Sequence, residues 1–371
     1  MKLAIERSAL LKGLGHVQSV VERRNTIPIL SNILLEADGS QLRLTATDLE
    51  LSMVETLPAS VSQPGATTVQ ALTFYEIARK LPDGAQIELA TEDATSMAIA
   101  AGRSNFKLAC LPREDFPVMT DGEMPHQFTV GAETAKRLIE TTRFAMSTEE
   151  TRHYLNGIYL HVFDADGSRM LRAVSTDGHR LAKVDVTCPP GAEELPGIII
   201  PRKAVGEIAK LADSGAEELT IGLSEAKIRV AAGPATLTSK LIDASYPDYQ
   251  RVIPKANDKA MTVGRDEILA GVERVATLAS DKTRAVKFHL EGDMLELLVS
   301  NPDAGSAKEE LEVEFGGEAL EVGFNSRYLT DILGQVEGDN VEIKFADANA
   351  PTLMRDPGDD GVLFVLMPMR V

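Results

Sequence analysis

The chain has no tryptophan, and only 5% of its 371 residues are aromatic. Its cores must therefore be built mainly from Leu, Ile, Val, Ala and Met. Only two cysteines occur, Cys110 and Cys188, which form neither a disulfide framework nor a CxxC metal pattern and fit a reducing cytoplasm. Residues 1–7 lack the apolar core of a signal peptide, and no apolar run approaches the roughly 18 residues of a membrane span. We therefore expect a cytoplasmic protein with no membrane partner.

Positive charge is also scarce. The 38 Lys and Arg residues face 56 Asp and Glu residues, which gives a formal net charge of −18. Nucleic acids attract basic surfaces, so this balance by itself argues against a nucleic-acid-binding protein. Any such function must come from an uneven distribution of the charges. The length indicates two or three domains.

Three segments of the chain begin alike, with a short apolar strand followed by a helical pattern. They start at Leu3, Phe128 and Met261, which are 125 and 133 residues apart, so the repeat is the size of a domain. Apolar and polar residues then alternate with period two, as in residues 157–162 and 170–174. This alternation predicts strands that turn one face toward a core.

The second half of each segment repeats the same plan of a strand, a helix and further strands. The helices predicted there lie near 74–81, 204–211 and 327–336, and each ends in a turn-rich stretch. One strand–helix–strands unit thus occurs six times, twice in each of three α+β domains. Polar, Pro-containing linkers near 121–126 and 254–259 separate the domains, which we place at 1–122, 126–253 and 257–371.

Several short phrases along this threefold repeat are typical of one protein family. They are Ile27-Pro28-Ile29-Leu30, Thr47-Asp48-Leu49-Glu50, Tyr154-Leu155-Asn156-Gly157, Thr176-Asp177-Gly178-His179-Arg180-Leu181, Pro201-Arg202-Lys203, Tyr246-Pro247-Asp248-Tyr249, Gly323-Phe324-Asn325 and Met367-Pro368-Met369-Arg370. With them, the chain resembles the bacterial DNA polymerase III beta subunits, the sliding clamps, from Met1 to Val371.

The resemblance implies three tandem DNA-clamp domains in each subunit and a head-to-tail homodimer that closes a ring, with helices inside and sheets outside. Such a ring encircles double-stranded DNA without sequence specificity. It tethers the alpha subunit of the replicative polymerase, the clamp loader and other proteins that carry clamp-binding peptides. It is an accessory subunit with no catalytic residue, metal or cofactor.

The charges of the predicted helices agree with a DNA-facing interior. Over 6–24, 73–81, 133–146, 201–211, 265–284 and 326–336 they sum to about +6, which leaves about −24 elsewhere. Lys136, Glu140 and Arg143 share one helical face, although such a face is also typical of ordinary surface ion pairs. Together with those the resemblance implies, the DNA-binding candidates are Arg24, Lys136, Arg143, His153, Tyr154, Arg202 and Lys203. His153 stands where such clamps can have a second tyrosine.

The resemblance also places a peptide-binding pocket between the second and third domains. Its predicted wall is Leu155, Thr176, Gly178, His179, Arg180, Leu181, Pro247, Arg251, Val252, Val365, Leu366, Met367, Pro368 and Met369. The apolar members suit peptide anchors, Met adapts to several partners, and Arg180 and Arg251 could meet polar groups at the rim. The alternative is an ordinary last core strand, but Pro368 must end a strand or lie at a sheet edge.

For the ring joint, the resemblance implies edge strands at 104–111 and about 307–313. Phe106 and Leu108 would face Leu278 on the fifth helix, and Arg103 or Lys107 would pair with Glu309 or Glu310. Because Asn105 and Lys308 reduce the charge complementarity, we expect apolar contacts and strand pairing to matter more than ion pairs.

Three other functions agree less well with the sequence. Asp177-Gly178-His179-Arg180 looks superficially like a catalytic base pair, but GxSxG, P-loop, HExxH and GxGxxG motifs are absent. The trimeric clamps of archaea and eukaryotes have two domains per subunit rather than three. A scaffold that merely uses the clamp fold would not stimulate processive DNA synthesis.

Overall fold

The structure is a computed structural model that describes residues 1–22, 26–120, 122–280, 282 and 284–370. Its parts form two compact units, and each is treated by itself. Unit 1 comprises residues 1–136, 189–195 and 203–242, and unit 2 comprises residues 137–188, 196–202 and 243–371. Arg24 lies outside the described residues.

The elements within the described residues follow the sixfold plan that the sequence predicts. The helices are α1 (Arg7–Gln18), α2 (Ala71–Lys80), α3 (Ala132–Arg143), α4 (Arg202–Ala212), α5 (Arg265–Ala276) and α6 (Ser326–Leu333). One strand precedes each helix, and these strands are β1 (Lys2–Glu6), β6 (Gly65–Gln70), β10 (His126–Gly131), β14 (Ile198–Pro201), β18 (Lys259–Gly264) and β23 (Leu320–Asn325).

Three strands follow each helix. In the first domain they are β2 (Asn32–Asp38), β3 (Gln41–Thr47), β4 (Leu51–Pro58), β7 (Gln86–Asp93), β8 (Ser96–Ala101) and β9 (Ser104–Leu111). In the second they are β11 (Gly157–Ala165), β12 (Ser168–Thr176), β13 (Arg180–Thr187), β15 (Glu218–Leu223), β16 (Lys227–Ala232) and β17 (Ala235–Lys240). In the third they are β19 (Ala285–Glu291), β20 (Met294–Asn301), β21 (Gly305–Glu312), β24 (Asn340–Phe345), β25 (Thr352–Arg355) and β26 (Val362–Leu366).

Short elements complete the described chain. The extra strands are β5 (Ser60–Gln63) and β22 (Glu314–Phe315), and the 3₁₀ helices are η1 (Pro28–Ser31), η2 (Arg113–Asp115), η3 (Glu150–Leu155) and η4 (Tyr249–Val252). η3 and η4 carry candidate site residues, as described below.

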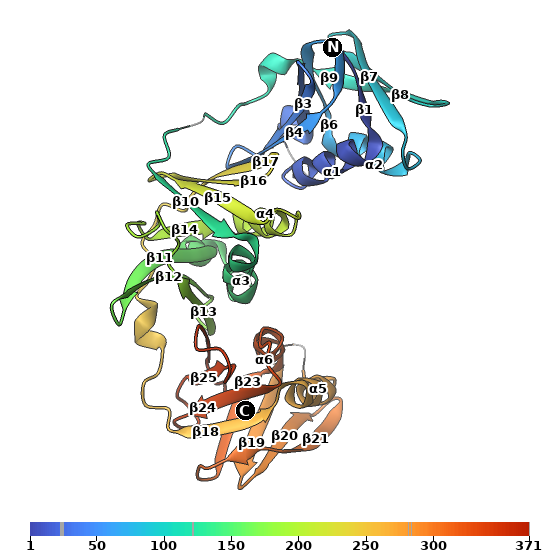
Figure 1. Cartoon of the computed structure of the whole chain (residues 1–371). Helices are drawn as coiled ribbons and strands as arrows, with labels where there is room; N and C mark the ends of the chain where they lie inside the picture. The colour runs from blue at the N-terminus through green and yellow to red at the C-terminus, as the bar shows by residue number, and fades with distance from the viewer. Residues whose placement is uncertain (23–25, 121, 281, 283, 371) are drawn as a thin grey trace. The chain divides into compact units, whose positions relative to one another are not determined.

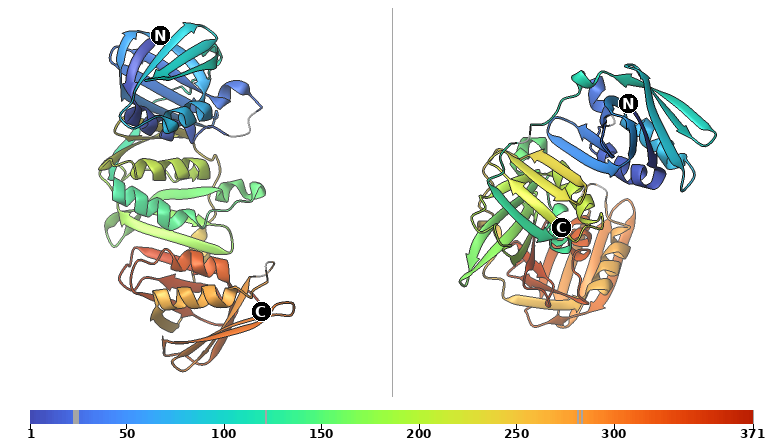
Figure 2. Two further views of the ribbon diagram at one scale, coloured as in Figure 1. Left: turned by 90° about the vertical axis from the view of Figure 1, so that its right-hand side faces the viewer. Right: turned by 45° about the horizontal axis from the view of Figure 1, so that its top comes forward.

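In unit 1, the strands join into one antiparallel sheet in the order β10-β15-β16-β17-β4-β3-β2-β6-β9-β8-β7-β1-β5. The central domain contributes β10 and β15 to β17, and β17 pairs with β4 of the first domain from Ala235↔Glu55 to Ser239↔Leu51. The helices α1 and α2 lie side by side (Figures 1 and 2). Leu10, Leu14 and Val17 of α1 are fully buried at helical spacing.

Unit 2 contains two antiparallel sheets. One has the order β14-β11-β12-β13-β26-β25-β24-β18-β22, and the other has the order β21-β20-β19-β23. β13 of the central domain pairs with β26 of the C-terminal domain, so the sheet crosses from one domain to the next. The helices α5 and α6 lie side by side in the C-terminal domain (Figure 1).

Several helices end earlier than the sequence predicts, and α1 and α5 end earliest relative to their predicted ranges. The helical pattern over 6–24 gives a helix only to Gln18, after which Val20 and Val21 make tighter bonds to the carbonyls three residues back. The pattern over 265–284 likewise gives a helix only to Ala276, and Thr277, Leu278 and Ala279 continue in such turns. Leu278 therefore lies beyond the fifth helix rather than on it.

Candidate functional site

The pairing of β13 with β26 brings most of the predicted peptide-pocket residues together. Leu181 lies opposite Val365, and Arg180 lies opposite Leu366. β26 ends at Leu366, as Pro368 predicts, and the Met367 amide donates to the carbonyl of His179 over 2.8 Å. The last residues of the chain therefore lie beside the turn at residues 176–180. We call this region the β13–β26 surface.

The turn at residues 176–180 is fixed by its own side chains. Asp177 Oδ1 accepts from the amides of His179 and Arg180, at 2.9 and 3.0 Å. Thr176 Oγ1 accepts from the Gly178 amide and donates to the Arg180 carbonyl. Gly178 has φ of 89°, in the left-handed region that glycine adopts without strain. Since Asp177 holds backbone amides, it orients the turn and does not activate the imidazole of His179.

η4 supplies the other wall of this surface. Its first residue, Tyr249, is buried in one cluster with Val174, Leu181 and Val365. Val252 at its other end is 47% exposed, and Met367 on the β26 side is 38% exposed. The Arg251 side chain is largely exposed and pairs with Asp248 over 2.8 Å. The surface thus has an apolar floor, two exposed apolar side chains and an arginine at its rim, which suits a short apolar peptide.

Arg180 is largely buried and already has polar partners within the chain. Its guanidinium pairs with Asp177 and Asp331, and it donates to the Phe144 carbonyl over 2.7 Å. It also lies over the ring of Tyr328, with the guanidinium carbon 4.4 Å from the centroid. Arg180 is therefore occupied within the chain, on the side that faces α6.

The sequence does not predict the polar network that lies beneath the β13–β26 surface. The Tyr249 hydroxyl is 2.8 Å from His161 Nε2 and accepts from Arg172 Nη1 at 3.2 Å. Arg172 in turn donates twice to Asp185, at 2.5 and 2.7 Å. The available signal was weak, because His161 and Arg172 face each other on neighbouring strands but nothing local indicates that they reach Tyr249.

Burial and pairing decide the ionisation of this network. Burial by itself would raise the pKa of Asp185, but hydrogen bonds from Arg172 and Lys183 outweigh it and hold the pKa below its usual value. Burial lowers the pKa of His161, so the neutral imidazole is favoured. The network therefore contains one ionised arginine–aspartate pair next to a neutral histidine.

Three of the predicted DNA-binding cations are already paired with carboxylates. Lys136 lies 2.7 Å from Asp213, and Arg143 lies 2.6 Å from Glu140. Lys203 pairs with Asp48 and, at 3.3 Å, with Glu22. Their positive charges are consequently partly offset within the chain.

The remaining DNA candidates in the described residues differ from these. Arg202 donates to the carbonyls of Met146 and Ser147, and burial lowers the pKa of its guanidinium. His153 and Tyr154 follow each other on η3, with their rings 5.8 Å apart and edge to face. His153 is exposed and Tyr154 is half-buried, so both rings reach the surface.

Two strands of the chain have open edges at the predicted ring joint. β9 pairs with β6 only at Leu111 and Cys110, so its edge over residues 104–109 is open on that side. β21 is the end strand of its sheet. Phe106 on β9 is 38% exposed, which is high for a phenylalanine. Both strands can therefore accept a partner strand.

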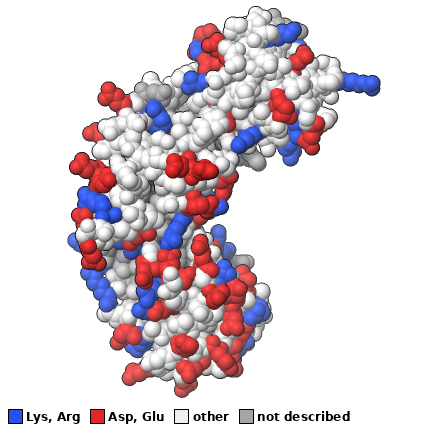
Figure 3. Space-filling view, viewed as in Figure 1, with Lys and Arg blue, Asp and Glu red and all other residues white. Residues whose placement is uncertain are grey.

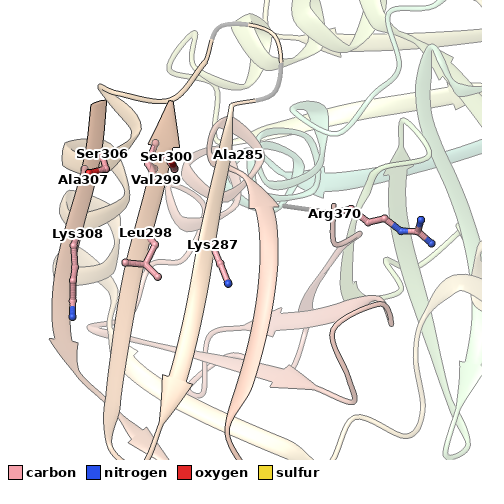
Figure 4. A pocket seen from close by; sticks show the side chains of 9 residues that line it. All are labelled: Ala285, Lys287, Leu298, Val299, Ser300, Ser306, Ala307, Lys308 and Arg370. Carbon is pink, nitrogen blue, oxygen red and sulfur yellow. The ribbon is translucent and has the colours of Figure 1, made fainter. Parts of the chain in front are cut away.

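The expected ion pairs at the joint have competing partners. Glu309 already pairs with Arg274, and Glu310 lies 2.9 Å from Lys308. Acidic side chains gather over the C-terminal domain around β20 and β21 (Figure 3). In Figure 4, Ser306, Ala307 and Lys308 of β21 line a hollow with Leu298 of β20. Pairing of Arg103 or Lys107 with these glutamates would require exchange of existing pairs.

Within the described part of the chain, no group of three or more His, Cys, Asp or Glu residues could hold a metal ion. Among the helices described above, none is long and apolar enough to cross a membrane.

Comparisons with known proteins cover the whole chain. Family profiles of the DNA polymerase III beta subunit match as its N-terminal domain over residues 1–120, its central domain over 129–248 and its C-terminal domain over 250–370. A beta sliding clamp of Caulobacter vibrioides is 51% identical and one of Escherichia coli is 38% identical, and each match covers 100% of both chains. A crystal structure of a sliding clamp from Bartonella birtlesii bound to griselimycin is 48% identical, with a TM-score of 0.97 and full coverage of both chains.

Proposed function

Because this chain belongs to the DNA polymerase III beta subunit family, we propose that it is a sliding clamp. Two copies join head to tail around duplex DNA and hold the replicative polymerase and other partners to it. The chain is an accessory subunit and has no active site of its own. It acts where the chromosome lies, in the cytoplasm. Its domains are those at 1–122, 126–253 and 257–371.

The observation that carries this proposal is the sixfold strand–helix–strands unit. Two subunits supply twelve such units in six similar domains, and a head-to-tail contact between similar domains closes a ring when the rotation allows it. A closed ring retains DNA by topology, so that its contacts can be weak and free of sequence preference. Processive synthesis requires this combination.

The charge distribution supports a DNA-facing role for the helices. The six helices carry thirteen Lys or Arg residues against eight Asp or Glu residues, a net charge of +5. The rest of the chain then carries −23, since the total is −18. The phosphate groups of DNA would therefore be attracted to the helices and repelled by the strands and loops.

We propose that the β13–β26 surface binds the peptides of partner proteins. Leu181 and Val365 form its floor, and Val252 and Met367 remain exposed as apolar contacts. Flexible Met side chains adapt to different apolar anchors, which suits a surface that several partners share.

We propose that the open edge of β9 in one subunit pairs with β21 of the other. Phe106 and Leu108 would then lose their exposure to water, with Leu278 as a further apolar contact. Edge strands left open in a soluble protein are usually covered or protected, and pairing of the two edges would cover both.

Retention on DNA of different topology tests the function. The chain is loaded by its clamp loader and ATP onto a nicked circle and separated from free protein by gel filtration. We expect it to stay with the circle and to be lost after the circle is cut once. Equal retention on circular and linear DNA would refute encirclement.

A further inference from the structure

A hollow of about 1030 Å³ lies within the C-terminal domain, where the chain crosses from one sheet of unit 2 to the other. β21 ends at Glu312 in the four-stranded sheet, and β22 begins at Glu314 at the edge of the nine-stranded sheet. The end of β18 and the first residues of β20 and β24 form the other sides. We call this space the β18 hollow.

β18 has an open edge inside this hollow. On one side it lies beside β24 and pairs with it along its whole length, from Lys259 to Gly264 (Figure 1). On the other side β22 pairs only with Met261 and Thr262. In the described part of the chain, no strand continues β22 beside Val263 and Gly264, and both of these residues line the hollow. An open strand edge presents backbone donors and acceptors to an added strand.

Two polar side chains beside this edge have no hydrogen-bond partner among the described residues. They are the carboxamide of Asn340, which lies opposite Gly264 on β24, and the hydroxyl of Thr262. Both groups can donate and accept, so both can bond the main chain of a segment laid along the edge. Met294 and Phe315 add apolar surface to the lining. The hollow thus offers contacts to a polypeptide main chain.

Three exposed carboxylates border the hollow, those of Asp293, Glu312 and Glu314. Within the described residues, no Lys, Arg or His side chain lies within ion-pair distance of any of them. Glu309 and Glu310, earlier on β21, are by contrast already paired. The lining residues include neither Lys nor Arg. A cationic side chain that enters the hollow can therefore pair without displacing another cation.

The next cation along the chain does not offset this negative charge. Arg265 directly follows Gly264, but its guanidinium donates to the Val336 carbonyl and pairs with Asp266. The carboxylate of Glu267 instead lies against Gly264. The local charge therefore attracts cationic ligands and repels the phosphate groups of DNA.

We propose that the β18 hollow binds an extended segment of a partner protein that is rich in Lys or Arg. The segment adds to the edge of β18 where β22 ends, and its main chain pairs beside Val263 and meets Asn340. Its cationic side chains reach Glu312 and Glu314. Alternate side chains of an extended chain point the same way, so cations at every second position match two carboxylates that are themselves two residues apart.

This site is separate from the β13–β26 surface and from the ring joint. The β13–β26 surface offers apolar contacts, whereas the β18 hollow offers carboxylates and an open strand edge. β21 contributes its last residue, Glu312, to the hollow, and the proposed joint uses the open edge of that strand. The hollow is formed within one subunit, whether or not two subunits close a ring. A partner that bound both surfaces would gain affinity from two points of attachment.

The test measures the binding of a model peptide to the full-length protein. The probe is an octapeptide of alternating Lys and Thr that carries fluorescein, and its anisotropy reports binding. The variant is Glu312→Gln with Glu314→Gln. The control is Glu273→Gln with Glu337→Gln, which removes two exposed carboxylates of the same domain that do not line the hollow. Both variants change the net charge equally, so a difference between them reports the hollow.

The loss of two exposed ion pairs should weaken the binding of the probe roughly fivefold. The control should stay within about twofold of the unmodified protein, and added salt should weaken binding to both. Equal affinities of the variant and the control would overturn the proposal.

A second peptide tests the addition of a strand. A fully N-methylated form of the octapeptide keeps its charges but has no backbone donors. We expect it to bind much more weakly, and equal binding of the two peptides would mean charge attraction alone and would overturn pairing with β18. If the carboxylate variant melts at a lower temperature than the unmodified protein, Asn340→Ala replaces it. An unchanged affinity of Asn340→Ala for the probe would likewise contradict the proposal.

Discussion

Removal of the Tyr249 hydroxyl group tests whether the polar network beneath the β13–β26 surface supports that surface. Tyr249→Phe keeps the ring that packs on Leu181 and Val365 but removes the partner of His161 and of Arg172 Nη1. A hydrogen bond to a charged group contributes about 1.5–3 kcal/mol. Arg172 keeps both bonds to Asp185, so the loss stays below the roughly 3–5 kcal/mol of a broken buried ion pair. We expect a net destabilisation of about 2–3 kcal/mol.

A matched control lies three residues away. The Tyr246 hydroxyl is buried, and no partner in the described structure makes a hydrogen bond to it, although the backbone of Thr176 lies nearby. Its ring stacks on Tyr159 with centroids 4.8 Å apart. Tyr246→Phe keeps this stacking and removes an unsatisfied polar group. Its stability should therefore change by less than about 0.5 kcal/mol or rise.

Urea unfolding followed by circular dichroism measures the stability of both variants. Fluorescence anisotropy with a labelled clamp-binding peptide from the replicative polymerase measures the function of the surface. We expect weaker peptide binding only in Tyr249→Phe, because η4 carries Val252 and Arg251 and is anchored through Tyr249. Equal stability of the two variants, or loss of peptide binding in both, would refute a supporting role for the hydroxyl network.

Three further outcomes are expected. Folding lowers the pKa of His161, so the stability that the neutral imidazole contributes is complete above the unfolded pKa near 6.5. This contribution decreases as the pH falls below that value. His161→Gln should therefore flatten the pH dependence of the free energy of unfolding in that range. Phe106→Asp with Leu278→Asp should convert dimers to monomers in sedimentation, and a persistent dimer would contradict the assigned joint. Asp48→Asn keeps the oxygen that accepts from the amides of Glu50 and Leu51 but leaves Lys203 with Glu22 as its carboxylate partner, and should raise duplex affinity up to about fivefold in an anisotropy titration.

The features that depend on neighbouring residues could be predicted from the sequence. The six strand–helix–strands units follow from hydrophobic periods, and the end of β26 follows from Pro368. The turn at 176–180 is held by bonds that span four residues or fewer, and the first domain repeats it at Thr47 and Asp48. In such cases the residues that cause the structure lie next to each other in the chain.

Features set by distant residues could not be predicted in this way. Lys203 meets Asp48 across 155 positions, and Tyr249 meets Arg172 across 77. Arg180 likewise meets Asp331 of α6 across 151 positions. The end of α5 at Ala276 depends on turns that the apolar pattern through Ala279 does not reveal. Only the folded chain brings these partners together.

The pairing of the helix cations bears on how a clamp can move. Lys136, Arg143 and Lys203 each have a carboxylate neighbour, so contact with a DNA phosphate exchanges one ion pair for another. Ion pairs as exposed as those of Lys136 and Arg143 contribute only about 0–1 kcal/mol, and their exchange changes the free energy by still less. Each phosphate step along DNA then meets a low barrier, while the closed ring prevents escape. Asp48→Asn removes the closer of the two carboxylate partners of Lys203, so Lys203 gives up less when it binds a phosphate. Diffusion along DNA should therefore slow in Asp48→Asn as its affinity rises, and an increase in affinity with unchanged diffusion would contradict the exchange of ion pairs as the reason for easy sliding.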